Sequence, residues 1–458
     1  MNFSVSELNN ILGKLKFKDF IGNNLLFNQV NIDTRKLMPG DLFLALVGKK
    51  YDGHNFLGEA IKKGAMALVI NEGKERLVPN GIPYWTVNDT LEAFQKLALF
   101  QRNKLNIPVV AITGSVGKTT TKEMSGEVLK KLGKIKLSYE NFNNEIGVSL
   151  TILDTDISDK LLVLEMGMRG LGQIENLSKY AEPDIAIITN IGSSHIGILG
   201  TRENISKAKC EITKYLNPNG LIIIPNGDSL LERSLKEVWK GRIIRVQILN
   251  IEQLGKTQEV TDNLIIGFYD DNNNLIKIEN KVFEISFKGI HNASNFLFVY
   301  ALSKEFGINF KDYNKFEFPS LDGRNKIIKT NKVTIMDETY NASPESVKAC
   351  VDLLKRYKKG KHFVILGSMK ELGIRSEDFH KEIFNYIIKK NVQGFIFICD
   401  SYEEKSLKTK YFIENKIYFV KDINEVIKRI NKLTHKGDFI LIKGSRYWQL
   451  EKIIPFID

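Results

Sequence analysis

The sequence has few cysteines, and it lacks the segments that carry a protein into or across a membrane. Its three cysteines, Cys210, Cys350 and Cys399, lie far apart and form neither a metal-binding nor a disulfide spacing. No stretch approaches the roughly 18 uninterrupted apolar residues of a membrane span. The first residues show no basic start followed by an apolar run, so we expect no secretory signal. These absences favour a protein of the reducing cytoplasm, without membrane insertion.

The chain also lacks a concentrated basic region, although its net charge is positive. It has 66 lysines and arginines against 54 aspartates and glutamates, which gives a formal net charge of +12. Such a charge attracts nucleic acids and anionic small substrates alike. The lysines, however, are spread along the whole chain and mixed with acidic residues, and no aromatic residues interleave a basic block. We therefore expect no nucleic-acid partner.

Strand-like segments alternate with helix-like segments along the chain, which predicts the α/β class. The length of 458 residues exceeds what one core accommodates, and 43% hydrophobic content is typical of globular proteins. We expect a small α/β domain over residues 1–87, a central domain over 88–320 and a C-terminal domain over 321–458. The Pro- and Gly-containing stretch at residues 319–324 is the predicted hinge between the last two.

The two larger domains differ in their predicted sheets. In the central domain, buried strands alternate with helices and predict a mostly parallel sheet, whereas period-two patterning over residues 242–288 predicts an antiparallel meander. The C-terminal domain shows four strand–helix alternations, which predict a Rossmann-like fold. Its strands are expected at residues 333–336, 363–366, 395–399 and 439–442. A Gly-x-Gly-x-x-Gly fingerprint is absent, so dinucleotide binding is not supported.

A glycine-containing loop at residues 113–119 follows a buried strand at 109–112 and precedes a helix expected over about 120–132. Such a loop turns backbone N–H groups toward a phosphate at the helix N-terminus. Lys118 would reach the outer phosphates, and the Thr119 hydroxyl would hold Mg²⁺. The Thr-Gly-x-x-Gly-Lys-Thr spacing is shorter than the common phosphate loop. An ordinary glycine turn with a surface lysine is the alternative, and the flanking strand, helix and hydroxyl argue against it.

Two polar side chains follow neighbouring predicted strands of the central domain. Glu165 ends the strand at residues 161–165, and His195 follows the strand at 185–190. Because the carboxyl ends of parallel strands face one crevice, both residues are expected beside the phosphate loop. A carboxylate, an imidazole and a hydroxyl around a nucleotide phosphate are suitable surroundings for a divalent metal. Ordinary polar residues at strand ends remain the alternative at this stage.

The short loop at residues 113–119 and the Gly-Ile-His-Asn-Ala-Ser-Asn segment at 289–295 resemble motifs of the Mur ligases. These are ATP-dependent amide-forming enzymes of peptidoglycan precursor synthesis. The resemblance extends over essentially the whole chain and all three domains. Further segments are similar to the branch that adds D-alanyl-D-alanine to UDP-N-acetylmuramoyl-tripeptide, namely residues 141–148, 165–174, 337–344, 367–373 and 443–446.

The chain departs from that branch at a few positions. Ser368 stands where the family usually has Asp, and Gln173 replaces the usual Glu. Milder replacements occur at Glu338, Thr339 and Ser343. The Asp-Asn-Pro-Arg motif of the relatives that add meso-diaminopimelate is absent. Another Mur-type ligase, a folylpolyglutamate-type ligase and a non-catalytic nucleotide-binding regulator are the alternative interpretations.

The resemblance implies a role for each residue that matches a family motif. The implied catalytic residues are Lys118, Lys209 and His195. The implied ATP-binding residues are Gly114, Ser115, Val116, Gly117, Lys118, Thr119, Thr120, Asn292, Asn295, Arg324 and Asp337. The implied metal ligands are Thr119, Glu165, His195 and Lys209, the last as a carbamate. The implied residues that bind the UDP-substrate are Asp33, Thr34, Arg35, Asn143 and Asn144. The implied residues on the dipeptide side are Tyr340 and Asn341.

The resemblance also implies the chemistry and its cofactors. ATP would phosphorylate the terminal carboxylate of the UDP-N-acetylmuramoyl-tripeptide, and the amine of D-alanyl-D-alanine would attack the acyl phosphate. One or two Mg²⁺ ions would accompany ATP, and Lys209 would be N6-carboxylated, because a carbamate supports a metal ion where an ammonium does not. We expect the chain to act as a monomer.

Overall fold

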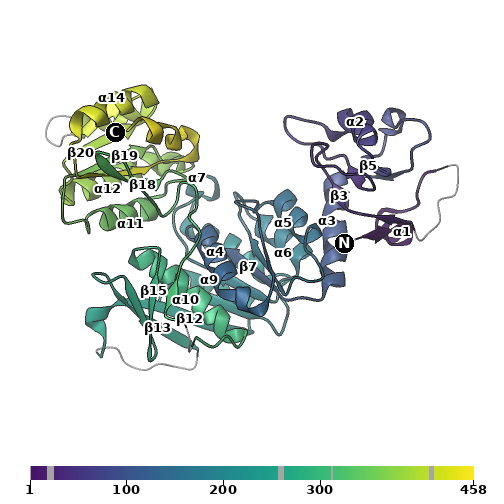
Figure 1. Ribbon diagram of the computed structural model, residues 1–458, viewed down its shortest axis with the longest axis horizontal. Helices are drawn as coiled ribbons and strands as arrows, with labels where there is room; N and C mark the ends of the chain where they lie inside the picture. Colours follow the sequence, from purple (N-terminus) through teal and green to yellow (C-terminus); the bar gives the residue numbers. More distant parts are fainter. Residues whose placement is uncertain (1, 18–24, 256–262, 311–312, 412–416, 458) are drawn as a thin grey trace.

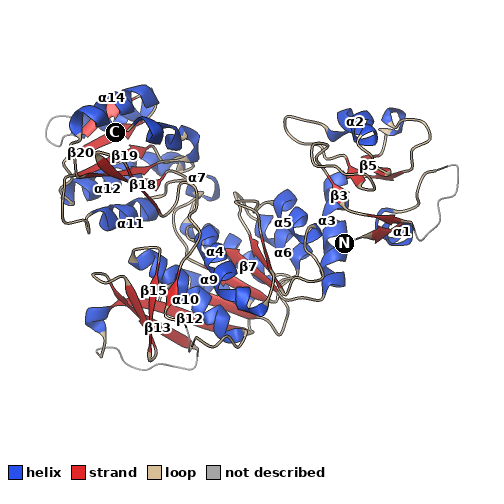
Figure 2. Ribbon diagram, in the orientation of Figure 1, coloured by secondary structure: helices blue, strands red, loops and turns tan. Residues whose placement is uncertain are grey.

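The computed structural model describes residues 2–17, 25–255, 263–310, 313–411 and 417–457. Its helices and strands gather in three bodies, which Figures 1 and 2 show as an N-terminal, a central and a C-terminal domain. The predicted three-domain α/β organisation is therefore confirmed, whereas the exact boundaries stay predictions. Among the described residues, the helices are all too short or too polar to cross a membrane.

The N-terminal domain is built on a four-stranded parallel sheet with the strand order β3-β4-β5-β6. The elements of this domain are β1 (Phe3–Ser4), α1 (Val5–Leu12), β2 (Leu26–Phe27), β3 (Val30–Asn31), β4 (Leu42–Leu44), α2 (Leu57–Lys62), β5 (Ala67–Asn71) and β6 (Tyr84–Val87). Helix α1 begins with a capping box, since the Ser4 hydroxyl accepts from the Glu7 N–H and the Glu7 carboxylate accepts from the Ser4 N–H.

Helix α3 (Thr90–Leu105) belongs to two cores at once. Asp89 caps it by accepting from the backbone N–H groups of Leu91 and Glu92. Its residues Phe94 and Leu97 lie in the apolar core of the N-terminal domain. Ala98, one position further on, lies in the core of the central domain. The helix therefore joins the two domains as a packed element.

The central domain contains a ten-stranded sheet with the order β16-β15-β14-β13-β12-β11-β10-β7-β9-β8. The strands are β7 (Val109–Thr113), β8 (Ile135–Leu137), β9 (Leu161–Glu165), β10 (Ile185–Ile188), β11 (Leu221–Pro225), β12 (Arg242–Asn250), β13 (Leu264–Asp270), β14 (Leu275–Ile278), β15 (Lys281–Ile285) and β16 (Lys315–Phe316). The helices are α4 (Lys118–Leu129), α5 (Glu145–Leu153), α6 (Gln173–Ala181), α7 (Ile196–Leu199), α8 (Arg202–Cys210), α9 (Ser229–Val238) and α10 (Ile290–Glu305).

The predicted antiparallel meander is confirmed for one part and wrong for another. Strands β13, β14 and β15 pair antiparallel, as expected. Strand β12, however, pairs parallel with both β11 and β13. Period-two patterning indicates a half-exposed strand and carries no information on its direction, which depends on the crossover connections at both ends. Residues 256–262, within the predicted meander, lie outside the described residues.

Both faces of the parallel strands around β7 are buried, as parallel sheets require. Val110 and Ile112 point to the face covered by α4 and α10, where Met124 and Phe296 pack. Val109 and Ala111 point to the opposite face, which α5, α6, α8 and α9 cover. The continuous apolar run of β7 follows directly from this double burial.

The C-terminal domain has a six-stranded sheet with the order β17-β18-β22-β19-β20-β21, in which only β17 is antiparallel. Its elements are β17 (Lys326–Lys329), β18 (Val333–Glu338), α11 (Pro344–Leu354), β19 (His362–Gly367), α12 (Ser376–Lys389), β20 (Gly394–Ile398), α13 (Ser401–Tyr411), β21 (Ile417–Val420), α14 (Ile423–Leu433) and β22 (Asp438–Lys443). The four predicted strands are present. The two edge strands β17 and β21 escaped prediction, since both are short and flanked by polar residues.

Candidate active site

The phosphate loop lies at the point where the strand order of the central sheet reverses. Strand β7 pairs with β9 on one side and β10 on the other, and the loop follows its carboxyl end. Ligands of open α/β sheets bind at such switch points. Gly114 and Gly117 have φ angles of 151° and 86°. A Cβ on Gly114 would lie 1.9 Å from the Thr189 hydroxyl, and one on Gly117 would lie 2.6 Å from the Asn295 Oδ1. Only glycine fits either position.

Hydrogen bonds fix this loop to the segment that follows β10. The Ser115 N–H donates to the Asn190 carbonyl at 3.1 Å, and the Val116 N–H donates to the Asn190 Oδ1 at 3.0 Å. The Gly192 N–H donates to the Ser115 hydroxyl at 2.9 Å. The loop is thus preorganised, and it leads into α4, whose N-terminus favours an anion.

Lys118 begins α4 and turns back across the loop. Its ammonium donates to the Gly114 carbonyl at 2.8 Å. Burial lowers the pKa of Lys118, while the Glu165 carboxylate opposes this shift and Arg324 adds to it. The side chain therefore brings a cation to the centre of the loop, where phosphate oxygens would be bound.

Thr119 and Glu165 form the best candidate for a magnesium site. The buried Thr119 hydroxyl donates to the Glu165 Oε2 at 2.6 Å, and the Asn143 amide donates to the Oε1 at 2.8 Å. A hydroxyl and a carboxylate oxygen side by side are the hard donors that Mg²⁺ prefers. The two residues fit the predicted ion through their donor chemistry.

His195 contributes an imidazole at the end of the loop that follows β10. Its backbone is left-handed, with φ of 64°, and its Nδ1 lies 2.5 Å from the Glu371 Oε2 of the C-terminal domain. The imidazole lowers the pKa of Glu371. Within the described part of the chain, no three His, Cys, Asp or Glu side chains gather as a metal site. Further ligands for an ion at this place would come from other groups, such as phosphate oxygens.

Lys209, on α8, is almost completely buried, with a relative exposure of 2%. Burial lowers its pKa well below the ordinary value, and the Lys118 charge lowers it further. Its side chain lines the same cleft as the phosphate loop. An amine with a lowered pKa is present partly as the neutral, nucleophilic form.

A cleft of about 1880 Å³ between the central and C-terminal domains unites most of the predicted site residues. From the central domain come Gly114, Ser115, Val116, Gly117, Lys118, Thr119, Thr120, Asn143, Asn144, Glu165, His195, Lys209, Asn292 and Asn295. From the C-terminal domain come Arg324, Tyr340 and Asn341. All of residues 141–147 thus face the phosphate loop across one cleft, together with Glu338 and residues 340–343 of the predicted substrate segment at 337–344.

Residues at and directly after the predicted hinge join the two walls of this cleft. The Asn292 amide donates to the Asn325 Oδ1 at 2.7 Å, which links α10 to the segment before β17. The Arg324 guanidinium lies 3.6 Å from the centre of the Tyr340 ring. Asp337 is buried behind this wall and accepts hydrogen bonds from the Thr339 hydroxyl and N–H. Asp337 does not line the cleft, in contrast to the other predicted ATP-side residues.

Asp33, Thr34 and Arg35 lie in the N-terminal domain and are not brought to this cleft. Arg35 forms an exposed ion pair with Asp33 at 2.7 Å and holds the pKa of that carboxyl below its ordinary value. The Thr34 hydroxyl donates to Glu59 on α2 at 2.9 Å. Their predicted role in UDP-sugar binding stays a prediction.

Sequence reasoning missed a buried lysine that orders the substrate side of the cleft. Lys122 on α4 is fully buried, and its ammonium donates to the carbonyls of Ser138 and Glu140 at 2.6 and 2.7 Å. This holds the chain immediately before residues 141–147. Lys122 follows Lys118 by one helical turn, which is the signal that could have placed both on one face.

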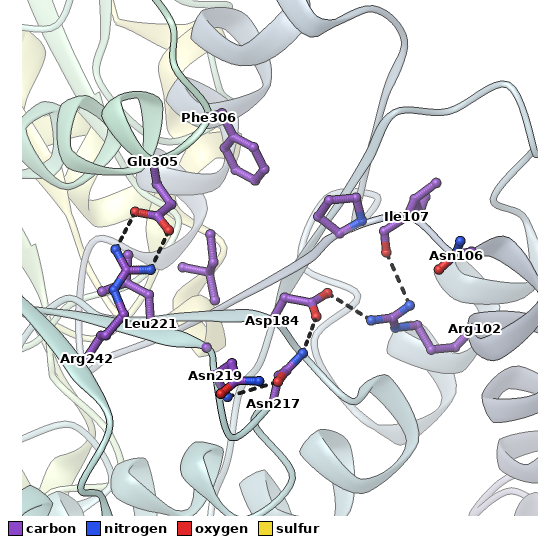
Figure 3. A pocket seen from close by; sticks show the side chains of 13 residues that line it. Arg102, Asn106, Ile107, Asp184, Asn217, Asn219, Leu221, Arg242, Glu305 and Phe306 are labelled. Atoms are coloured by element: carbon purple, nitrogen blue, oxygen red, sulfur yellow. Dashed lines mark hydrogen bonds and ion pairs between the residues drawn. The ribbon is translucent and has the colours of Figure 1, made fainter.

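A second hollow, of about 410 Å³, lies at the opposite end of the central sheet, where β7, β10 and β11 begin. Its charged groups are already paired with one another (Figure 3). Arg102 on α3 binds Asp184 at 2.9 Å, and Arg242 binds Glu305 through two hydrogen bonds. These contacts fasten helices to the sheet, and they offer no free group for chemistry.

With this geometry established, comparison with known protein families gives a consistent result. Residues 27–102 match the model of the Mur ligase family catalytic domain, 112–303 that of the Mur ligase middle domain, and 323–446 that of the Mur ligase glutamate ligase domain. The chain belongs to the Mur ligase family. The family resemblance of the sequence motifs is thereby confirmed.

Individual relatives narrow the comparison to one kind of Mur ligase. The chain is 35% identical to the UDP-N-acetylmuramoyl-tripeptide–D-alanyl-D-alanine ligase of Bacillus subtilis, over 93% of this chain and 92% of the relative. It is 33% identical to the ligase of the same name from Synechocystis, over 93% of this chain and 90% of the relative. The crystal structure of the MurF ligase from Thermotoga maritima in complex with ADP superposes with a TM-score of 0.80 at 28% identity, covering 94% and 96% of the two chains.

Proposed function

We propose that this chain joins D-alanyl-D-alanine to UDP-N-acetylmuramoyl-tripeptide, with ATP as the phosphoryl donor. The observation that carries the proposal is the shared cleft, in which Lys118 and the Thr119–Glu165 pair face residues 141–147 and residues 340–343 of the segment at 337–344. The relatives from Bacillus subtilis and Synechocystis are named for this reaction. The product would be UDP-N-acetylmuramoyl-pentapeptide, a precursor of peptidoglycan, made in the cytoplasm by a monomeric enzyme.

The reaction needs two steps, because a carboxylate has no leaving group that an amine can displace. First, a tripeptide carboxylate oxygen attacks the γ-phosphorus of ATP, and ADP leaves. The dipeptide amine then attacks the acyl carbon, phosphate leaves, and the amine gives up a proton to form the amide. Phosphoryl transfer depends mainly on positioning and charge neutralisation. The cleft supplies both, through the preorganised loop and its cation.

Lys118 would neutralise the phosphoryl group as it moves toward the incoming carboxylate. Thr119, Glu165 and His195 would hold Mg²⁺, which when bound lowers the repulsion between the two anions. Asn292, Asn295 and Arg324 would form the nucleotide side, and Asp337 would support it from behind the cleft wall. The UDP-substrate would contact Asp33, Thr34, Arg35, Asn143 and Asn144, and the dipeptide would contact Tyr340 and Asn341.

Lys209 would act as an N6-carboxylated residue. Its buried position and the nearby Lys118 cation favour the neutral amine, which is the form that attacks CO₂. Formation of the N–C bond releases one proton from the neutral amine, so that, with the proton already lost from the ammonium, the side chain changes from a cation to an anion and two protons go to solvent. That anion would lie in the same cleft as Lys118, and it would support a second metal ion.

One assay tests the proposed reaction. Purified protein is mixed with ATP, Mg²⁺, UDP-N-acetylmuramoyl-tripeptide and D-alanyl-D-alanine, and phosphate release is followed. We expect release that requires both the tripeptide and the dipeptide, together with a pentapeptide product detected by mass spectrometry. Release without the dipeptide, or no release, would contradict the proposal. Release supported by a folate and glutamate would favour the folylpolyglutamate-type alternative.

A further inference from the structure

The segment that carries His195 is held by two acidic residues of the C-terminal domain. The Ser193 N–H donates to the Glu345 Oε1 at 2.8 Å. The Gly197 N–H donates to the Glu371 main-chain carbonyl at 2.9 Å, and the Glu371 carboxylate lies 2.5 Å from the His195 Nδ1. Figure 1 shows α7, at the end of this segment, between the central and C-terminal domains. A candidate metal ligand of one domain is thus oriented by the other domain.

Two glycines allow the main chains of the two domains to approach this closely. A Cβ on Gly197 would lie 2.4 Å from the Gly373 nitrogen, and one on Gly373 would lie 2.6 Å from the Gly197 Cα. No larger residue fits at either position without moving the backbone. Buried apolar residues of both domains, Ile196 of α7 and Leu372 among them, belong to one continuous cluster. The domains are therefore docked here by packing as well as by polar contacts.

The contact with Glu371 determines how the imidazole of His195 is presented. A carboxylate beside Nδ1 favours the hydrogen on that nitrogen, which leaves the lone pair of Nε2 for a metal ion. Metal-bound histidines commonly carry such a carboxylate on their second nitrogen, and its loss weakens metal affinity about 10–100-fold. Both residues also adopt left-handed backbones, with φ of 64° for His195 and 65° for Glu371. Such conformations persist where surrounding contacts hold them.

We propose that Glu371 is the positioning residue of His195, so that docking of the C-terminal domain at Gly197 and Gly373 completes the metal site of the central domain. This inference rests on the proposed function for the role of the metal. It adds that the domain expected to bind the dipeptide also controls the ion that serves ATP. The chain would then bind the metal tightly only when the C-terminal domain is docked on the central domain.

The first test measures metal binding without requiring ligation. Mn²⁺ is titrated into the full-length protein with ADP, and free Mn²⁺ is followed by electron paramagnetic resonance. Glu371→Gln, which keeps the shape of the side chain and removes its charge, is expected to weaken Mn²⁺ binding about 10-fold or more. Glu382→Gln is the matched control, since Glu382 pairs with Lys348 inside the C-terminal domain. Unchanged Mn²⁺ affinity in Glu371→Gln would overturn the inference.

A double-mutant cycle separates positioning from a general loss of structure. If Glu371 acts through His195, then Glu371→Gln adds no further loss of Mn²⁺ affinity in the His195→Ala background. A full additional loss there would contradict the proposed mechanism. The melting temperatures of all variants are compared with that of Glu382→Gln, so that unfolding is detected directly. Because ADP replaces ATP, this outcome does not depend on the proposed ligation reaction.

Glycine variants test the docking half of the inference. Gly373→Ala places a methyl group against Gly197 and is expected to reproduce the weaker Mn²⁺ binding of Glu371→Gln. Gly437→Ala is the control, because Gly437 also has a positive φ, of 92°, but open space around it. Both variants introduce backbone strain at a positive φ, but only Gly373→Ala obstructs the contact between the two domains. Equal Mn²⁺ affinity in the two variants would argue against docking as the cause.

Discussion

The Thr119 hydroxyl donates a 2.6 Å hydrogen bond to the Glu165 Oε2 and so links the start of α4 to the end of β9. Both side chains are buried, with relative exposures of 7% and 2%. A buried carboxylate that loses its donor bears a desolvation penalty, so the pair is expected to be sensitive to single substitutions. Its position beside Lys118 makes it the natural starting point for mutational tests.

Thr119→Val removes the hydroxyl at nearly constant volume. We expect the rate of phosphate release to fall about 100-fold, because one donor to the metal and one partner of Glu165 are lost together. Thr119→Ser retains the hydroxyl and is expected to stay within a few-fold of the parent. The two variants are compared at saturating ATP and Mg²⁺. Similar rates in Val and Ser would show that the hydroxyl has no part in turnover.

Lys118→Ala removes the cation that lies across the predicted phosphate loop. We expect turnover to fall at least about 100-fold while the protein remains folded. The matched control is Lys130→Ala, since Lys130 lies exposed at the far end of the same helix and pairs with Glu127. Phosphate release and the circular dichroism spectrum are measured on both. Turnover near the parent level in Lys118→Ala would remove this residue from the mechanism.

Lys209→Ala tests the carbamate directly. Protein equilibrated with ¹³C-bicarbonate should show a carbamate resonance by ¹³C NMR, and the resonance should be absent from Lys209→Ala. Turnover should fall in that variant and recover partly when a short free carboxylate is added. Lys207→Ala, on the exposed face of the same helix, serves as the control and should keep the resonance. Full activity in Lys209→Ala would exclude a carbamate role.

Gly117→Ala should weaken ATP binding because the added methyl group crowds the phosphate loop. The added Cβ would lie 2.6 Å from the Asn295 Oδ1, and φ of 86° adds backbone strain of about 1 kcal/mol. Gly227→Ala has a nearly equal φ of 84° with open space around it, so it controls for the strain alone. We expect a raised KM for ATP in Gly117→Ala only. Equal KM values for ATP in the two variants would show that backbone strain, and not the contact of the added Cβ with Asn295, is responsible for the weaker binding.

His291 predicts an acid sensitivity of folding. Burial, reinforced by the Lys443 and Arg356 charges, lowers its pKa from 6.5 to about 4. Between these two pH values the His291 imidazole is protonated in the unfolded chain and neutral in the folded chain. The free energy of unfolding therefore falls as the pH drops from 6.5 toward 4. Between pH 7 and 5 this amounts to about 1–2 kcal/mol.

Urea unfolding at pH 7 and pH 5 measures this contribution. The parent should lose more free energy of unfolding on acidification than His291→Gln, which has no titrating group there. His435→Gln, at an exposed position, should behave like the parent. An equal loss in the parent and in His291→Gln would show that acid acts elsewhere in the molecule.

The sequence predicted those features that depend on local patterns. The strand at residues 161–165 and the phosphate loop between β7 and α4 are both where spacing placed them. Apolar runs, cap residues and glycines act over a few neighbouring residues, so a single sequence contains their signal. The direction of β12 was wrong because parallel pairing is decided by connections far along the chain.

Contacts between distant segments were the part that sequence could not supply. Glu371 lines the cleft and Lys122 lies buried behind it, and both act through partners that no spacing rule connects with them. A lone lysine on a helix usually points to solvent, and a lone glutamate in a loop usually does as well. The family resemblance placed Lys209 in the site, whereas its sequence surroundings alone indicated a solvated helix residue.

Helix α3 limits how this chain can be divided for experiments. Its Phe94 and Leu97 complete the N-terminal core, while Ala98 and the Arg102–Asp184 pair fasten its other end to the central sheet. A fragment ending before Asp89 would expose Trp85 and Phe27 of that core, and is expected to aggregate on expression. A fragment extended through Leu105 would keep the core closed. Separate preparation of the N-terminal domain should therefore start from the longer fragment.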